Sequence, residues 1–218
     1  MLPNIEIIKA LSEAYSPCQF FGKCKEAKWI PEEGHIPRGF LGATGSVDEV
    51  EAIFVFAEPG HPMMNEHGSY PDSLDPEGYM ELTTDFAFKC FDREVDVMHS
   101  NVKYILNQVW PSLLFAEQLK KVWMTETRLC SIDKEIGNIP IGNRDICSRK
   151  YLKKQLNIFP EATVVGFGGK AHETLRRLNV KHLEAWSVSP PGANNSKARD
   201  SWDEVIEVLS LKAFKKGK

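Results

Sequence analysis

An acidic residue stands directly after a short apolar run that is predicted to form a strand. Ile53-Phe54-Val55-Phe56 leads into Ala57-Glu58-Pro59-Gly60-His61-Pro62. A buried strand that ends in a carboxylate next to proline and glycine fixes the position of that charge, and in parallel α/β sheets ligands bind at the carboxyl edge. Glu-Pro-Gly is also good turn chemistry by itself. The motif alone therefore indicates either a ligand-binding edge or an ordinary turn.

The cysteines carry the second chemical signal. The chain has five, an odd number that does not favour a disulfide framework: Cys18, Cys24, Cys90, Cys130 and Cys147. Four form the pairs Cys18-x5-Cys24 and Cys130-x16-Cys147, whereas Cys90 lies in an apolar context typical of a core thiol. Four thiolates can hold a [4Fe-4S] cluster. Zinc sites usually have Cys-x(2–4)-Cys pairs, so zinc and four unconnected thiols are the alternatives.

Two further features have a weaker chemical meaning. The turn Gly166-Phe167-Gly168-Gly169-Lys170-Ala171 could let a phosphate approach the start of a helix. It lacks the spacing of the dinucleotide and P-loop motifs, so tight packing of strand against helix is the preferred interpretation. Basic residues gather over 144–154 and more loosely over 176–199, where they could face nucleic acid or form solvated helix faces.

The elements that must position these residues alternate between strand and helix. Short apolar strands are predicted at Ala52–Phe56, Lys121–Thr125, Thr163–Phe167 and Leu183–Trp186. Helices are predicted over 4–15, 77–91, 101–110, 144–156, 171–178 and 200–211, the last with Asp200 as its N-cap. This alternation implies βαβ crossovers, so we expect an α/β fold with a three-layer αβα arrangement and a four-stranded parallel sheet.

Length and composition bound the class of protein. The chain has 218 residues, 42% of them hydrophobic and 26% charged, which is ordinary for a soluble globular protein. No apolar run approaches the ~20 residues that span a bilayer, and the N-terminal residues lack the pattern of a signal peptide. We therefore expect one cytoplasmic domain over 1–218. A net charge of −3 argues against binding nucleic acid through charge alone.

The order of these features resembles the uracil-DNA glycosylase superfamily. That family has a four-stranded parallel sheet, and its first motif, at the end of the first strand, has forms such as Gly-Gln-Asp-Pro-Tyr and Gly-Glu-Ala-Pro-Gly. Phe56-Ala57-Glu58-Pro59-Gly60 matches it in position and in its Pro-Gly end. Ser187-Val188-Ser189-Pro190-Pro191-Gly192 occupies the place of the second motif, often His-Pro-Ser-Pro, after the fourth strand. Residues 61–120 match poorly.

The iron–sulfur branches of that family carry two cysteines near the N-terminus and two more that flank the segment after the second strand. The resemblance therefore implies that a [4Fe-4S] cluster, with zinc as the less favoured occupant, is held by Cys18, Cys24, Cys130 and Cys147. The N-terminal pair is wider here than the usual Cys-x2-Cys. In the resembling proteins the cluster is structural and is not needed for hydrolysis.

The resemblance implies a DNA glycosylase that hydrolyses the N-glycosidic bond of a flipped damaged or deaminated base, uracil or a related one, in single- or double-stranded DNA. We expect the protein to be a monomer that does not associate with a membrane. A carboxylate would stabilise the oxocarbenium-like sugar or orient the water. By position Glu58 takes this role, with Ser187 in the slot of the usual catalytic histidine. The base would meet Ala57, Pro59, Gly60, Glu126 and Ser189.

Glu126 occupies the position of the family's base-reading asparagine. An ionised carboxylate accepts hydrogen bonds but donates none, so we expect a base edge that bears an amino group rather than uracil's O4. The alternative is that Glu126 only pairs with Arg128 or with a loop lysine.

Other side chains are assigned by type and position. Tyr70 or Tyr79 could form the aromatic platform for the base, and His61 and His67 could supply a proton or be surface histidines. Phosphates could be bound by residues that are otherwise solvated loop residues: Arg38, Asn194, Asn195, Lys197 and Arg199. Two other functions stay open, a catalytically weak nucleic-acid-binding relative and a hydrolase or transferase that acts on free nucleosides or nucleotides.

Overall fold

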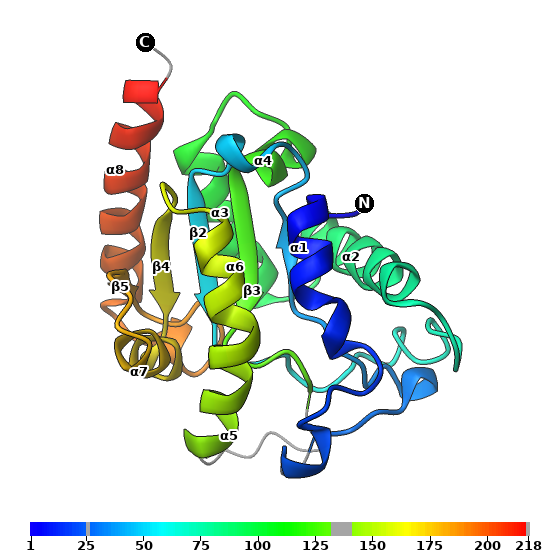
Figure 1. Ribbon diagram of the computed structural model, residues 1–218. Helices are drawn as coiled ribbons and strands as arrows, with labels where there is room; N and C mark the ends of the chain where they lie inside the picture. Colours follow the sequence, from blue (N-terminus) through cyan, green and yellow to red (C-terminus); the bar gives the residue numbers. More distant parts are fainter. Residues whose placement is uncertain (25–26, 132–140, 217–218) are drawn as a thin grey trace.

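One mixed β-sheet organises the protein. The computed structural model describes residues 1–24, 27–131 and 141–216. The strand order is β1-β3-β2-β4-β5 (Figure 1). Four strands run parallel: β2 (Ala52–Phe56), β3 (Val122–Glu126), β4 (Thr163–Phe167) and β5 (Leu183–Ala185). They confirm the α/β class and the parallel core of the sheet.

The predicted sheet of four parallel strands is wrong in its strand count. A fifth strand, β1 (Leu41–Gly42), pairs antiparallel with β3 at the edge. Its two residues are too few to show an alternating pattern in the sequence. Gly42 has φ +108°, and a Cβ at this position would collide with the carbonyl oxygen of Val122. The absence of a side chain therefore allows β1 to approach β3 so closely.

Helices cover both faces of the sheet. They are α1 (Ile5–Leu11), α2 (Pro76–Arg93), α3 (Val97–Val109), α4 (Phe115–Lys121), α5 (Ile141–Cys147), α6 (Lys153–Ile158), α7 (Gly169–Arg177) and α8 (Ala198–Lys216). A π-helical turn, Ser148–Leu152, joins α5 to α6, and a 3₁₀ turn, Ser12–Ala14, follows α1. α4 was not predicted. The predicted N-cap Asp200 lies inside the first turn of α8, where its carboxylate still faces the positive end of the helix dipole.

The central strand β2 divides two hydrophobic cores. Ile53 and Val55 belong to the core beneath α1 and α6, whereas Phe54 and Phe56 belong to the core beneath α3 and α8 (Figure 1). All five residues of β2 are buried, which explains its continuous apolar sequence. The two cores on opposite faces confirm the three-layer arrangement. In the part of the chain that the structure describes, no helix is long and apolar enough to cross a membrane.

Candidate functional site

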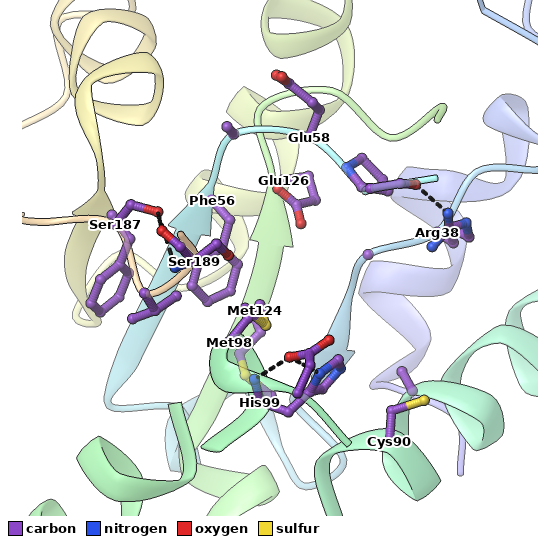
Figure 2. Close-up of a pocket in the computed structure, with 18 of the residues that line it drawn as sticks. Arg38, Phe56, Glu58, Cys90, Met98, His99, Met124, Glu126, Ser187 and Ser189 are labelled. Atoms are coloured by element: carbon purple, nitrogen blue, oxygen red, sulfur yellow. Dashed lines mark hydrogen bonds and ion pairs between the residues drawn. The ribbon is translucent and has the colours of Figure 1, made fainter. Parts of the chain in front are cut away.

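A cavity of about 880 Å³ opens at the carboxyl ends of the parallel strands. Its wall is formed by the ends of β2, β3 and β4, by the loop after β5, and by α2 and α3 (Figure 2). This is the edge at which ligands bind in parallel α/β sheets. The cavity includes most of the residues predicted for the site: Arg38, Ala57, Glu58, Pro59, Gly60, Glu126, Ser187 and Ser189.

Four predicted phosphate-binding residues lie outside this cavity wall. Asn194, Asn195 and Lys197 are exposed in and after the 3₁₀ turn Gly192–Asn194. The Asn195 side chain accepts a hydrogen bond from the backbone N–H of Lys197 at 2.9 Å, so it stabilises its own turn. Arg199 is exposed on α8 and lies over the ring of Tyr104, 3.2 Å from its centroid. These side chains form a rim beside the cavity rather than part of it.

Glu58 is held by a lysine from the glycine-rich turn. Lys170 Nζ donates a hydrogen bond to Glu58 Oε1, and the Glu58 side chain is only 13% exposed. Lys170 stands in the first turn of α7, which begins directly after Gly168 with φ +88°. A Cβ on Gly166 would lie 3.0 Å from Leu175 Cδ1, so the predicted tight packing of strand against helix is confirmed. The turn also positions an ammonium group against Glu58.

Glu126 differs from Glu58 in its electrostatic surroundings. Glu126 is 5% exposed, and its Oε2 atom has no hydrogen-bond partner among the described residues. Burial raises the pKa of this carboxyl well above its usual value, the charge of Glu58 raises it further, and Arg38 opposes the shift. The raised pKa favours the neutral form of Glu126, whereas the sequence prediction assumed an ionised acceptor. A neutral carboxyl can donate one hydrogen bond and accept others.

The alternative that Glu126 pairs with Arg128 is wrong. None of the three guanidinium nitrogens of Arg128 has a hydrogen-bond partner in the described chain, and Glu126 makes no ion pair with a lysine there. Glu126 instead packs against Gly39, which has φ +84°. A Cβ on Gly39 would lie 2.7 Å from Glu126 Cγ and 2.9 Å from Pro59 Cγ. Only glycine fits both the backbone and the space at this position.

Arg38 turns toward the protein. Its Nη2 donates a hydrogen bond to the carbonyl oxygen of Gly60, and its Nε lies 3.5 Å from Glu66 Oε1 (Figure 2). The Arg38 side chain is 14% exposed. These contacts tie the Pro59-Gly60 turn to the loop before β1. Arg38 therefore shapes the cavity wall in this conformation, whereas the sequence had indicated a phosphate contact.

The loop after β5 holds Ser187 in a tight turn. Ser187 Oγ donates to the carbonyl oxygen of Ser189 and accepts from its backbone N–H, both at 3.1 Å. A Cβ on Gly192 would lie 2.7 Å from Ser187 Cβ, and one on Gly168 would lie 3.1 Å from it. The small side chain of Ser187 therefore fits between two glycines, and its hydroxyl is engaged within its own loop.

An aspartate–histidine pair on α3 was missed by the sequence reasoning. His99 Nδ1 lies 2.7 Å from Asp96 Oδ1, and both residues line the cavity (Figure 2). The His99 ring packs edge-on against Phe91, with 4.5 Å between centroids. Asp96 is also the N-cap of α3, so Asp-x-x-His at a predicted helix start was the available signal. A carboxylate that orients an imidazole is a common arrangement for proton transfer.

The other histidines differ in their access to the cavity. His61 lines it and stacks edge-on against His35, with 5.4 Å between centroids, whereas His67 is exposed and does not belong to the cavity wall.

Both tyrosines predicted as base platforms are in the core. Tyr70 and Tyr79 are each 2% exposed and do not line the cavity. Tyr70 donates a hydrogen bond to Glu66 at 2.7 Å, and Tyr79 stacks on Tyr15. The aromatic surface of the cavity is instead supplied by Phe56 and Phe167, stacked with 5.4 Å between centroids, together with other phenylalanines. Strand phenylalanines look like core residues in a sequence, which concealed their place at the edge.

Four cysteines gather around a second, smaller pocket. Cys18, Cys24, Cys130 and Cys147 all line it together with Arg128. The fifth, Cys90, is buried as predicted, and burial raises the pKa of its thiol to about 11. The structure therefore brings the two predicted cysteine pairs together at one pocket, although they are far apart along the chain.

Four cysteines that line one pocket are a set of residues that could hold an iron–sulfur cluster. A tetrahedral zinc with Zn–S bonds of about 2.3 Å needs sulfur atoms within about 4 Å of one another. Among the described residues, no three or more histidine, cysteine, aspartate or glutamate side chains are grouped closely enough to hold one metal ion. The buried, unpartnered guanidinium of Arg128 provides a positive charge beside four potential thiolates.

No protein-family model matches the chain. A search of curated proteins likewise finds no significant match.

The geometry therefore carries the functional argument. One cavity combines a carboxylate paired with a lysine, a buried carboxyl with a raised pKa, an Asp–His pair and a phenylalanine surface. Such a set can bind a flat, partly polar ring and apply both negative charge and proton donors to it.

Proposed function

We propose that the protein is a DNA glycosylase-like hydrolase that cleaves the N-glycosidic bond of a flipped damaged or deaminated base. The observation that carries the proposal is the contrast between two carboxyl groups at neighbouring strand ends. Glu58 is paired with the ammonium group of Lys170, whereas burial raises the pKa of Glu126 and favours its neutral form. Environments that separate two carboxyls in this way assign them different chemical roles.

Glu58 would act on the sugar. As the glycosidic bond breaks, positive charge develops on the deoxyribose, and a nearby carboxylate stabilises it or orients the attacking water. The Oε2 atom of Glu58 is buried and has no hydrogen-bond partner among the described residues, while Oε1 is held by Lys170. Lys170 thus fixes the orientation of the carboxylate and reduces the net charge of the site.

Glu126 would read the base. A neutral carboxyl presents an O–H donor beside a C=O acceptor, which complements a base edge with an adjacent acceptor and N–H donor. Uracil, hypoxanthine and xanthine all present such an edge, so the neutral state of Glu126 widens the substrate class beyond amino-bearing bases. The stacked Phe56 and Phe167 rings provide an apolar surface for an extruded base.

His99 is the best-placed group to assist the departing base. Ser187 occupies the slot of the expected histidine, but its hydroxyl bonds within its loop. In Figure 2, Glu126 lies between Glu58 and His99. We therefore assign His99, oriented by Asp96, to stabilise negative charge on the leaving base from the side opposite Glu58.

A [4Fe-4S] cluster bound by Cys18, Cys24, Cys130 and Cys147 would serve the fold. When bound, it would cross-link the N-terminal segment to the segment that follows β3. The hydrolytic step is assigned to residues of the cavity alone.

The decisive test is excision from oligonucleotides. Single- and double-stranded DNA carrying uracil, hypoxanthine or xanthine is incubated with the protein, and abasic sites are then cleaved with alkali. We expect strand cleavage that Glu58→Gln lowers by about 100-fold or more, and that Glu81→Gln, an exposed change on α2, leaves intact. Binding without cleavage across the whole panel would instead indicate a nucleic-acid-binding relative. Turnover of free nucleosides alone would indicate the nucleoside-specific alternative.

A further inference from the structure

Arg128 is a buried cation whose guanidinium has no hydrogen-bond partner in the part of the chain that the structure describes. Arg128 is 0% exposed, and its Nε, Nη1 and Nη2 atoms all lack hydrogen-bond partners among the described residues. Other arginines of the chain are paired: Arg176 binds Glu184 through three hydrogen bonds, and Arg177 binds Asp145. A buried charge without compensation is strongly unfavourable, so its presence calls for an anion in the same place.

The backbone on both sides of Arg128 is held by hydrogen bonds. The N–H of Thr127 donates to the carbonyl oxygen of Phe56 at 2.9 Å, and the Thr127 hydroxyl donates to the carbonyl oxygen of Ala57. On the other side, the N–H of Arg38 donates to the carbonyl oxygen of Leu129 at 3.0 Å. Arginine side chains usually extend along apolar surface until their charged end reaches water. Here the chain on both sides of Arg128 is fixed, and its side chain lines the cysteine pocket.

The positive charge of Arg128 lies beside the cysteines. The pocket that it lines is also lined by Cys18, Cys24, Cys130 and Cys147. A cation at this place would favour the thiolate forms that bind metal. A [4Fe-4S] core held by four thiolates carries a net charge of about 2−, which needs a counter-charge in an apolar pocket.

We propose that Arg128 is the buried counter-cation of an iron–sulfur cluster held by Cys18, Cys24, Cys130 and Cys147. It positions and tunes the cluster without being one of its ligands. The inference rests on the four-cysteine cluster, and it does not depend on which reaction the cavity performs. Under this proposal Arg128 has two opposite effects on stability. Its charge destabilises the metal-free protein and stabilises the protein that holds the cluster.

The test compares wild type with Arg128→Met and Arg128→Lys, each prepared metal-free and after anaerobic reconstitution with iron and sulfide. Arg149→Met, an exposed change on the π-helical turn, is the matched control. We expect metal-free Arg128→Met to melt above metal-free wild type. After reconstitution it is expected to bind less iron and to melt below reconstituted wild type, so the order of stability reverses.

The reduction potential gives a second readout. Removing a positive charge near the cluster disfavours the more negative reduced state, so we expect Arg128→Met to shift the one-electron reduction equilibrium at least tenfold, or about 59 mV, toward the oxidised form. Arg128→Lys keeps the charge and is expected to stay close to wild type in iron content and potential.

Three results would overturn the proposal. Wild type that takes up no iron and shows no broad absorbance near ~400 nm removes the anion on which it depends. Metal-free Arg128→Met that is less stable than metal-free wild type, or does not fold, shows that Arg128 contributes packing instead. An unchanged iron content and potential in Arg128→Met shows that the charge is not felt by the cluster.

Discussion

Replacing Glu126 with glutamine is expected to change how the free energy of unfolding depends on pH. In the folded protein, burial raises the pKa of the Glu126 carboxyl and so favours its neutral form, and the charge of Glu58 adds to this effect. In the unfolded chain the same group titrates near its ordinary value of 4.5. The unfolded state therefore releases a proton that the folded state retains once the pH rises above that value.

The sign and the size follow from linkage. A raised pKa in the folded state contributes stability that is fully present below the unfolded pKa and is lost as the pH rises toward the folded one. Within that window wild type loses about 1.4 kcal/mol per pH unit relative to the glutamine variant, which cannot ionise. Over two pH units the difference is about 2.7 kcal/mol, or roughly 5–10 °C in Tm for a chain of this size.

Urea unfolding at a series of pH values from 5.0 to 7.5 measures this difference. The free energy of Glu126→Gln minus that of wild type is expected to rise with pH, whereas Glu207→Gln, an exposed change on α8, is expected to run parallel to wild type. Adding Glu58→Gln should narrow the effect, because Glu58 is one cause of the raised pKa. A difference between Glu126→Gln and wild type that does not change with pH would refute the neutral carboxyl and, with it, the base-reading role assigned to Glu126.

Two further predictions concern the walls of the cavity. Gly39→Ala is expected to destabilise the protein by about 1–3 kcal/mol, because a Cβ meets Glu126 and Pro59 at a positive φ. Gly60→Ala, with open space at its Cβ, should cost much less, and equal Tm values for the two variants would contradict this account. Asp96→Ala is expected to cost about 1 kcal/mol through loss of the α3 N-cap and also to lower base excision through His99, whereas Asp96→Asn keeps the cap acceptor. If Asp96→Asn retains full excision activity, the carboxylate does not orient His99 for catalysis.

The elements that were predicted well are those whose own residues determine them. β2 and β4 occupy the predicted ranges because their apolar runs are continuous and bounded by turn residues. β3 begins one residue later than predicted, because Lys121 closes α4, which joins the strand without a loop. With no turn residue between them, α4 could not be separated from the strand by pattern. β1 is too short to have a pattern at all.

The site residues that were missed depend on contacts between distant segments. The sequence around Tyr70 does not show that its hydroxyl donates a hydrogen bond to Glu66 in the core. The sequence of α3 likewise does not show that His99 lines the cavity at the edge of the sheet. The ionisation state of Glu126 also follows from its burial in the folded protein rather than from its type. The location of the cavity was predictable because the carboxyl ends of parallel strands converge, whereas the protonation and pairing of its side chains were not.

The end of β3 and the segment that follows it, residues 126–130, contribute side chains first to the cavity and then to the cysteine pocket. Glu126 faces the cavity, Thr127 ties the segment to β2, and Arg128 and Cys130 face the cysteine pocket. A change of residue type at one of these positions alters one function and leaves the others in place. A change of length alters all of them at once, because inserting or deleting one residue moves every later side chain into its neighbour's position. Libraries that aim to alter base selectivity should therefore randomise residue 126 without changing the spacing to Arg128.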